Sequence, residues 1–490
     1  MLKTSDLAME AQAATQERQD TLPCLCVDLD GTLVQTDTLI ESVLAYVRLR
    51  PWRLLRVIGW LFLGKARFKQ ELGRAITLQA DTLPYARPFL EYIEAESKKG
   101  REILLVTAAD SSIALPVAAH LGFFTHVICT EGRQNISGKT KLEAIRKKLG
   151  NQEFSYAGNS RQDLAVWKGA KSAVIVSAPA GVRKAVERSG VTIEKVFPGR
   201  RFSLRTLLKA TRAYQWTKNA LVLVPIVLGH RLRDPATIVL GIRAFFAFSL
   251  CASAIYLIND LLDLTTDRRH VRKRHRPLAA GQLSIPAAVL MVVALFVGAA
   301  FLNPSGEAAI LLGLYVVSAI AYSLYLKRLL MVDVIMLASF YSLRLLYGGA
   351  ATGITVSIWT LAFSMFMFLS LALIKRISEL RSRTSEEGLT ASGRGYHIGD
   401  LEQLTALCAA SGLVSALIVI LYVRSPEVAP LYARPQLLLG IFPLLAYWQS
   451  RLLILANRGA IHEDPILFSL SDRASLAVVA GLVALVVAAV

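Results

Sequence analysis

The feature that most constrains this chain is a series of long apolar segments that starts near Arg205 and continues to the last residue. A helix satisfies its own backbone hydrogen bonds, so it can cross a bilayer with about 20 mostly apolar residues. The pattern therefore predicts an all-α polytopic bundle of about nine transmembrane helices. The predicted spans lie near 217–232, 238–258, 285–302, 308–326, 332–350, 356–374, 401–422, 436–457 and 474–490.

The distribution of basic residues predicts how this bundle is oriented. If the first 200 residues are cytoplasmic, the loops on their side hold fifteen Lys and Arg residues, against four in the opposite loops. Cytoplasmic loops are enriched in these residues. The first 22 residues also lack the apolar stretch of a cleaved signal. We therefore expect a cytoplasmic N-terminus, with the long charged loops on the same side.

The first 200 residues have a different pattern. Short apolar runs such as CLCVDL, EILLVTA and AVIVSA alternate with helix-like stretches, which predicts an α/β domain with a parallel sheet. We expect a disordered tail over 1–21, the α/β domain over 22–198 with a mostly helical insert at about 36–85, and the membrane domain over 199–490. Within the insert, the segment 51–64 is too short to span. It predicts either the core of a helical cap or a face that lies on the membrane.

Composition separates this chain from nucleic-acid-binding proteins. It is 54% hydrophobic, with a mean hydropathy of +0.47, although it carries 55 Lys and Arg against 36 Asp and Glu. A basic nucleic-acid binder would lack long apolar runs, and no zinc-finger spacing or aromatic-basic RNA motif is present. Five scattered cysteines predict neither a disulfide framework nor a zinc site.

An acidic stripe follows the second predicted span, in the stretch NDLLDLTTD. Asp260, Asp263 and Asp267 are spaced i, i+3 and i+7, which places three carboxylates on one face of a helix that prolongs the span. Like charges repel, so they need a counter-ion, and Mg²⁺ binds carboxylates while keeping bonds to substrate phosphates. Asn259 can add a neutral oxygen.

A dense basic cluster comes next, and it contains Arg268, Arg269, Arg272, Lys273, Arg274 and Arg276. Taken singly, these residues are explained equally well as topology charge beside a membrane. Together with a metal they suit a departing diphosphate, because cations neutralise the charge that develops on it. The sequence therefore predicts a reaction that leaves a carbocation-like carbon.

The stretch NDLLDLTTD followed by KRHRPLAAG resembles the first aspartate-rich motif of the UbiA superfamily of intramembrane prenyltransferases. The resemblance spans roughly 205–490. It implies a nine-helix, Mg²⁺-dependent enzyme that ionises a diphosphate substrate. On this basis Asp260 and Asp263 are candidate catalytic residues, and Asp260, Asp263 and Asp267 are candidate metal ligands.

The second acidic motif of that family is missing. Lys375, Arg376 and Glu379 stand where two aspartates would be expected. This loop, with RAYQWTKN (212–219), DVIMLASFYSLRLLYGG (333–349) and DPILFSLSD (464–472), is similar to the decaprenyl-phosphate phosphoribosyltransferase branch. That branch moves ribose 5-phosphate from phosphoribosyl diphosphate (PRPP) onto a polyprenyl phosphate.

Both substrates implied by this resemblance are anionic, so they need cations. Arg344 lies inside a predicted span, where an arginine is costly and usually faces a partner or cavity; Asp333 is one candidate partner. The candidate substrate- and phosphate-binding residues are Lys218, Asn219, Asn259, Lys273, Arg274, Arg276, Arg344, Lys375, Arg376 and Glu379.

A second motif, CLCVDLDGTLVQTD, places Asp28 and Asp30 at the carboxyl end of a strand, where α/β sheets bind ligands. One carboxylate can attack phosphorus while the other manages a proton, with Mg²⁺ between them. DxDGT resembles motif I of the haloacid dehalogenase (HAD) superfamily of phosphatases.

The rest of that family's pattern follows in order. The resemblance implies catalytic roles for Asp28, Asp30, Thr107 and Lys141, with Lys139 as a rival to Lys141, and metal ligands Asp28, Asp30, Asn159 and Asp163. The family most often has an aspartate at the position of Asn159, so one charge is lost here. The domain is therefore either a working phosphatase or a degenerate regulatory or structural one.

The two halves together predict a transferase of the bacterial cytoplasmic (inner) membrane that builds a lipid-linked pentose. We expect 5-phosphoribose transfer from PRPP to a polyprenyl phosphate, removal of the 5-phosphate by the HAD domain, and downstream envelope-pathway enzymes as partners. The alternative is a standard prenyltransferase that joins a prenyl diphosphate to an aromatic or glyceryl acceptor, with a non-catalytic HAD domain.

Overall fold

The structure is a computed structural model, and it describes residues 22–49, 51–62, 64–130, 136–199, 203–381, 395–426, 428, 432–461 and 464–490. The chain divides into two compact units. The first comprises Met1–Thr211 and Leu257–Met291, and the second Arg212–Tyr256 and Val292–Val490. The predicted tail over 1–21 lies outside the described residues.

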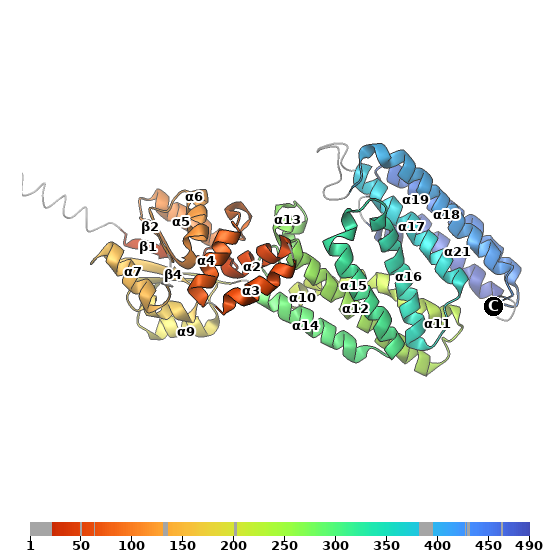
Figure 1. Ribbon diagram of the computed structural model, residues 1–490, viewed down its shortest axis with the longest axis horizontal. Coiled ribbons are helices and arrows are strands. Elements are labelled where there is room, and N and C mark those ends of the chain that lie inside the picture. The colour runs from red at the N-terminus through yellow and green to blue at the C-terminus, as the bar shows by residue number, and fades with distance from the viewer. Residues whose placement is uncertain are drawn as a thin grey trace, which may run out of the picture. The chain divides into compact units, whose positions relative to one another are not determined.

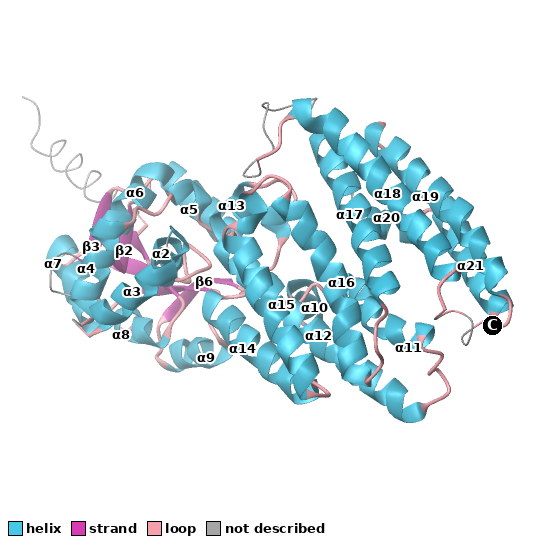
Figure 2. Cartoon of the chain, turned by 45° about the vertical axis from the view of Figure 1, so that its right-hand side comes forward, coloured by secondary structure: helices cyan, strands magenta, loops and turns pink. Residues whose placement is uncertain are grey.

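The first unit is built on a six-stranded parallel sheet, the magenta layer of Figure 2, in the order β3-β2-β1-β4-β5-β6. Its strands are buried on both faces in the middle of the sheet, which explains their continuous apolar runs. The strand order reverses between β1 and β4, so the carboxyl ends of these two strands form a switch point where ligands bind. The strands are β1 (Cys24–Val27), β2 (Ile103–Asp110), β3 (His126–Thr130), β4 (Phe154–Gly158), β5 (Ser172–Val176) and β6 (Thr192–Phe197).

Helices cover the sheet and form two hydrophobic cores. One core packs Phe89 and Ile93 against β1 and β2, and the other packs Trp167 and Ile145 against β4 and β5. The helices are α5 (Arg87–Lys98), α6 (Ser111–Leu121), α7 (Lys139–Leu149), α8 (Leu164–Trp167) and α9 (Ala180–Arg188), and α10 (Leu204–Ala210) follows the last strand (Figure 1).

The insert between β1 and β2 is helical, as predicted. It has its own small core, which consists of Tyr46, Val57, Phe68 and Leu72. Its elements are α2 (Thr38–Leu49), the 3-10 turn η1 (Pro51–Arg53), α3 (Leu54–Leu61), α4 (Lys65–Ala75) and the 3-10 turn η2 (Ala80–Thr82). Of helix α3, Val57 is buried and Trp60 is partly buried against the same core, whereas the other described residues of 51–62 are largely exposed.

The second unit consists of apolar helices. The described residues contain seven helices that are long and apolar enough to cross a membrane, or eight if the bent pair α20 and α21 counts as one span. The seven are α12 (Pro235–Leu262), α14 (Ile285–Leu302), α15 (Gly306–Leu324), α16 (Val332–Thr352), α17 (Ile358–Arg381), α18 (Leu401–Val423) with the turn before it, and α19 (Ile441–Asn457) with the turn before it. The predicted class, an α/β unit joined to a helical membrane bundle, is confirmed.

The two ends of the bundle differ from the nine predicted spans. The first predicted span, 217–232, is broken into the 3-10 segment η4 (Ala213–Leu223) and a five-residue helix, α11 (Val224–Leu228). Pro225 lies at the start of α11, where its fixed φ and missing N–H are tolerated, and the chain turns again at His230. The last predicted span is preceded by α20 (Pro465–Ser471), which meets α21 (Arg473–Ala489) at 86°.

Candidate functional site

The first candidate site lies at the carboxyl end of β1. Asp28 follows the strand directly, and the Lys141 ammonium, in the first turn of α7, lies 2.8 Å from its Oδ1. The same ammonium is 2.9 Å from the Tyr156 hydroxyl and 3.7 Å from Asp163 Oδ1. The side chains of Lys141 and Asp28 are almost fully buried, whereas Lys139 is exposed. Of the two rival lysines, the structure therefore brings Lys141 to the predicted nucleophile.

Asp163 holds the loop that follows β4. Its Oδ2 accepts hydrogen bonds from the backbone N–H groups of Asn159 and Ser160, at 3.2 and 2.9 Å, and from the Ser160 hydroxyl at 2.7 Å. Its Oδ1 accepts from the Tyr156 hydroxyl at 2.7 Å. Both oxygens of this predicted metal ligand are thus engaged by protein donors, and Asp163 positions Asn159.

Asn159 packs directly on the turn that carries the paired aspartates. Gly31 adopts a φ of +71°, and a Cβ at this position would lie 2.0 Å from Asn159 Nδ2. Only glycine permits both the backbone conformation and the close approach. Asp30, on the same turn, accepts a hydrogen bond from the N–H of Thr38 at the start of α2, at 2.8 Å.

Burial controls the protonation of both aspartates. It raises the pKa of Asp28 to about 6, although the Lys141 charge opposes the shift. Burial also raises the pKa of Asp30 to about 7, and the nearby Asp37 charge adds to the effect. At neutral pH, Asp28 is mostly ionised and suited to attack, whereas Asp30 exchanges a proton readily.

Thr107, a predicted catalytic residue, lies in the interior of the sheet. It is fully buried at the end of β2, and its hydroxyl accepts a hydrogen bond from the N–H of Ala109 at 3.0 Å. The neighbouring residues Ala108, Ala109 and Asp110 line the cavity, but Thr107 does not.

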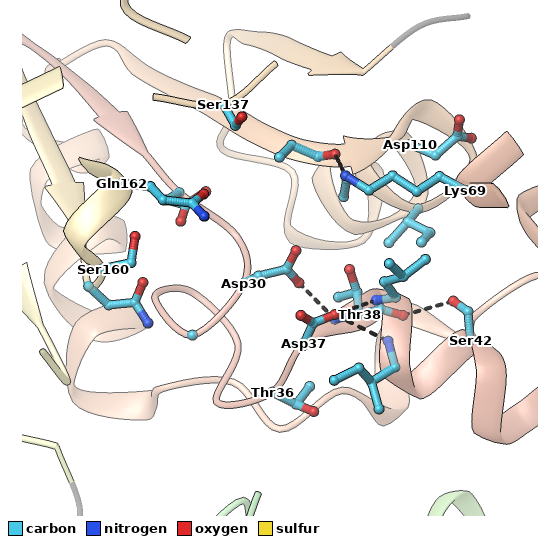
Figure 3. Close-up of a pocket in the computed structure, with 18 of the residues that line it drawn as sticks. Asp30, Thr36, Asp37, Thr38, Ser42, Lys69, Asp110, Ser137, Ser160 and Gln162 are labelled. Carbon is cyan, nitrogen blue, oxygen red and sulfur yellow. Dashed lines mark hydrogen bonds between the residues drawn. The ribbon is translucent and has the colours of Figure 1, made fainter. Parts of the chain in front are cut away.

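Asp28, Asp30, Lys141, Asn159 and Asp163 line a cavity of about 750 Å³. Figure 3 shows Asp30, Ser160 and Gln162 around this space together with Lys69, which comes from α4 of the insert. The Lys69 ammonium donates to the carbonyl of Ala108 at 2.7 Å, a bond that closes the insert over the end of β2.

The donor set fits Mg²⁺, a hard cation that prefers oxygen ligands. Asp28, Asp30 and Asn159 offer two carboxylates and one amide oxygen to the same cavity. Among the described residues, no group of three or more His, Cys, Asp or Glu side chains is arranged to hold a metal. Asn159 offers an amide in place of a carboxylate, which lowers the charge available to an ion at the first site.

The second candidate site is the acidic stripe. Helix α12 ends at Leu262 and α13 (Leu264–Arg269) starts two residues later, so the predicted single helix bends at Asp263. Helical hydrogen bonds continue through the bend, from Asp263 N–H to the Asn259 carbonyl and from Asp267 N–H to the Asp263 carbonyl. The stripe therefore stays on one helical path.

The basic cluster supplies the counter-charge. Arg276 Nη1 lies 3.0 Å from Asp260 Oδ1 and 2.5 Å from Asp267 Oδ2, and both carboxylates are buried. Lys273 and Arg274 lie in the exposed turn η5 together with His275. Two of the three predicted metal ligands thus converge on one guanidinium.

Asn259 carries an unsatisfied group beside this convergence. Its Oδ1 is buried and has no hydrogen-bond partner among the described residues. An orphaned buried acceptor costs about 1–3 kcal/mol, so such an atom marks a place for a missing donor or cation. Carboxylates next to an orphaned amide oxygen fit Mg²⁺.

In the second unit, two predicted lysines meet on one carboxylate. Lys218 Nζ lies 2.5 Å from Asp464 Oδ2, and Lys375 Nζ lies 3.5 Å from the same oxygen. Asp464 also caps α20 by accepting from the Ile466 N–H at 3.1 Å. Asp464 was not among the predicted site residues. The sequence does mark it as a helix cap, because it is an aspartate directly before a proline at the start of a helix.

Arg344 and Asn219 also come together. Arg344 Nε donates to Asn219 Oδ1 at 2.9 Å, and the guanidinium lies 5.0 to 5.7 Å from the ring centres of Phe248, Tyr341 and Tyr315. An intramembrane arginine is thereby satisfied by an amide and aromatic faces.

The suggested partner of Arg344, Asp333, is used elsewhere. It pairs with Arg376 at 2.7 Å and accepts a hydrogen bond from Tyr396. Arg376 also contacts Glu379, and its side chain is fully buried. Arg376 and Glu379 thus belong to a buried ion-pair network.

The chain combines two parts. One is an α/β unit with paired aspartates, and the other is a bundle of apolar spans with an acidic stripe beside it. Together they define an integral membrane protein with two candidate sites. The haloacid dehalogenase-like hydrolase profile matches residues 25–168, and the UbiA prenyltransferase family profile matches residues 222–461. The chain belongs to the UbiA prenyltransferase family through its C-terminal part and carries a HAD-like hydrolase region in its N-terminal part. Both predicted resemblances are confirmed.

Curated relatives extend this result. The chain is 35% identical to uncharacterized protein y4nM of Sinorhizobium fredii over 93% of its own length and 88% of that protein. It is 33% identical to nodulation protein NoeC of Azorhizobium caulinodans over 56% of its length and 91% of that protein. Decaprenyl-phosphate phosphoribosyltransferase of Corynebacterium glutamicum is 39% identical over 36% of this chain and 54% of its own.

Proposed function

We propose that this protein is a Mg²⁺-dependent transferase that moves 5-phosphoribose from PRPP to a polyprenyl phosphate. The observation that carries the proposal is the meeting of Lys218 and Lys375 on Asp464. Lys375 stands where other members of the family have an acidic motif, and cations there suit a reaction whose two substrates are both anionic. The named activity of the corynebacterial relative supports the same substrates.

In the proposed reaction, the bond between the anomeric carbon and the diphosphate breaks, and an oxygen of the lipid phosphate forms the new bond to that carbon. Mg²⁺ held by Asp260, Asp263 and Asp267 would neutralise the departing diphosphate. Arg276 keeps Asp260 and Asp267 pointing to one place. Lys218 and Lys375 bind phosphate, and Asn259 offers its buried amide oxygen.

We further propose that the HAD region removes the 5-phosphate of the lipid product. Asp28 attacks phosphorus and forms an aspartyl phosphate as the bond to the ribose 5-oxygen breaks, Lys141 neutralises the phosphoryl charge, and Asp30 gives a proton to the leaving oxygen. Water then hydrolyses the aspartyl phosphate, with Asp30 accepting its proton, so that phosphate is released and Asp28 is restored. The contact between Lys141 and Asp28 and the raised pKa of Asp30 support these roles. The product would be a polyprenyl-phosphoryl-ribose, made at the cytoplasmic face of the inner membrane for envelope-pathway enzymes to use.

The test incubates the purified full-length protein in detergent with PRPP, a polyprenyl phosphate and Mg²⁺, and weighs the lipid product by mass spectrometry. We expect a phosphoribosyl adduct that then loses one phosphate. Asp260→Asn lowers the transfer rate about 100-fold or more, and Asp28→Asn blocks only the loss of phosphate. Lys375→Ala raises the KM for PRPP about tenfold or more, whereas Lys139→Ala, an exposed lysine outside both sites, changes neither step.

The competing function is that of a standard UbiA prenyltransferase with a non-catalytic HAD region, because the matching family is named for that activity. The same preparation, given a labelled prenyl diphosphate and an aromatic or glyceryl acceptor, separates the two. Prenyl transfer without any phosphoribosyl adduct would decide for the competing function.

A further inference from the structure

Helix α3 of the insert exposes a concentrated apolar surface. Its members, which we call the α3 face, are Trp52, Leu54, Leu55, Ile58, Leu61 and Phe62. Phe62 is 86% exposed and Leu55 is 73% exposed, whereas Val57, on the opposite side of the helix, is 4% exposed. Val57 and the partly buried Trp60 are the α3 residues that pack into the core of the insert, so no member of the α3 face belongs to that core.

Leaving such a surface in water is unfavourable. Removal of each large apolar side chain from water stabilises the protein. Contiguous exposed apolar patches of this kind mark interaction sites on proteins or membranes. Two arginines accompany the face: Arg56 is exposed, and Arg53 lies 4.8 Å above the Tyr46 ring. Basic residues beside an apolar helical face suit a bilayer with anionic headgroups.

The same unit contains the start of an apolar helix that is long enough to span a membrane. Leu61 of the α3 face lines the cavity of the hydrolase site together with Ser284, Ile285 and Pro286. Ile285 and Pro286 form the first turn of α14, a helix apolar enough to span a membrane. Val289 and Leu290, one turn further on, expose 49% and 71% of their surface, as lipid-facing residues do. Leu61 therefore lines the same cavity as the first turn of this apolar helix.

We propose that the α3 face is seated in the membrane interface, where it holds the hydrolase cavity against the lipid surface. The partner is the bilayer that α14 enters. A second consequence rests on the proposed hydrolase function: the cavity receives the phosphorylated head of a lipid that stays in the membrane. Its apolar lining residues, Leu39, Ile40, Leu61, Phe68, Leu72 and Ile285, suit the part of such a substrate next to the head.

Membrane contact is tested without any activity assay. The five native cysteines are buried in the structure, so a cysteine placed at Phe62 can be labelled selectively with an environment-sensitive fluorophore. The labelled full-length protein is reconstituted in vesicles of phosphatidylethanolamine and phosphatidylglycerol that contain a spin-labelled lipid as quencher. Leu115→Cys on α6, which replaces another exposed leucine outside the α3 face, is the matched control.

We expect the lipid-borne quencher to reduce the emission at position 62 several-fold more than at position 115, and aqueous iodide to show the reverse order. Quenching by iodide at both positions would show that the α3 face is open to water and would overturn the proposal. Protection of position 62 from both quenchers would show that a protein covers the face, and would overturn it equally.

The second consequence is tested with the double variant Leu55→Glu, Phe62→Glu, neither of which lines the cavity. We expect hydrolysis of a vesicle-borne phosphomonoester to fall about tenfold or more, while hydrolysis of a water-soluble phosphomonoester stays unchanged. Leu115→Glu should affect neither. Equal rates on vesicles would overturn this consequence. A wild-type protein without hydrolysis of either substrate would refute the hydrolase function, and the quenching result would stand by itself.

Discussion

Both terminal nitrogens of Arg268 donate hydrogen bonds to the carboxylate of Glu41, at 2.8 and 2.6 Å. The two residues are 227 positions apart in the sequence. Both side chains are nearly inaccessible to solvent, and Arg268 Nε also donates to the Ala279 carbonyl. Glu41 belongs to α2 of the insert, whereas Arg268 directly follows the acidic stripe. The basic cluster therefore fixes the loop after the stripe to the hydrolase unit, a role that topology charge does not require.

We expect Glu41→Gln to loosen this loop, because it leaves the buried Arg268 without its counter-charge. Breaking a buried ion pair from one side costs about 3–5 kcal/mol. Amide hydrogen exchange of residues 264–281 should rise accordingly. The control is Asp81→Asn, because Asp81 pairs with Arg269 at a site where both side chains are 55% exposed and a change of less than about 1 kcal/mol is expected. Equal hydrogen exchange in the two variants would show that the ion pair between Glu41 and Arg268 does not hold this loop.

Gly31→Ala should disable the hydrolase site. The added Cβ would lie 2.0 Å from the Asn159 side chain. The alanine would also have to adopt a left-handed φ, which is strained for this residue. Mg²⁺ binding, followed by calorimetry in detergent, should weaken at least about tenfold because Asn159 is displaced. Gly100→Ala is the control, since Gly100 also has a positive φ but nothing lies within 4 Å of its Cβ position. Similar metal affinities in both variants would show that strain alone matters.

Glu194 should make the stability of the sheet edge depend on pH. Burial opposes its ionisation, but hydrogen bonds from Arg101, Tyr92 and Ser172 outweigh burial and lower the pKa of Glu194 from 4.5 to about 2. A carboxylate with a depressed pKa stabilises the fold above its ordinary pKa, and this contribution disappears as the pH falls from about 4.5 to 2.

We therefore expect Glu194→Gln to destabilise β6 at pH 7 and to have progressively less effect below pH 4.5. Hydrogen exchange of β6 at several pH values measures the difference. Glu187→Gln, which removes an exposed ion pair with Arg183, should have little effect at any pH. A Glu194→Gln effect that persists unchanged at pH 3 would rule out the ionised carboxylate as its cause.

Asn259→Leu distinguishes a ligand from a merely buried amide. Removal of an unsatisfied buried oxygen is neutral or stabilising for the fold. If the oxygen serves the substrate or its metal, the same change should lower the transfer rate about 100-fold. Thermal unfolding in detergent and the phosphoribosyl-transfer assay measure the two effects. A stable variant with full activity would remove Asn259 from the site.

The sequence predicted the parts of the sites whose geometry is local. Asp28 and Asp30 follow an apolar strand, so their place at the carboxyl edge of the sheet follows from strand periodicity. The spacing of Asp260, Asp263 and Asp267 likewise predicts one helical face, although not the bend at Asp263.

Contacts between distant segments were not predictable in this way. Lys218 meets Asp464 across 246 positions, and Asp333 pairs with Arg376 instead of Arg344, because tertiary packing decides which of several charged groups come together. The first predicted span, 217–232, is not one continuous helix, for a related reason. Hydropathy measures apolar content only. It does not predict that residues 213–228 form a 3-10 segment followed by a separate helix of five residues.

The hydrolase unit is not a contiguous stretch of chain. It includes Leu257–Met291, which follows a segment of the second unit, Arg212–Tyr256, in the sequence. A genetic dissection that stops at residue 200 would therefore deprive Glu41 of its arginine and the cavity of one wall. The first 200 residues are therefore not a complete folding unit by themselves.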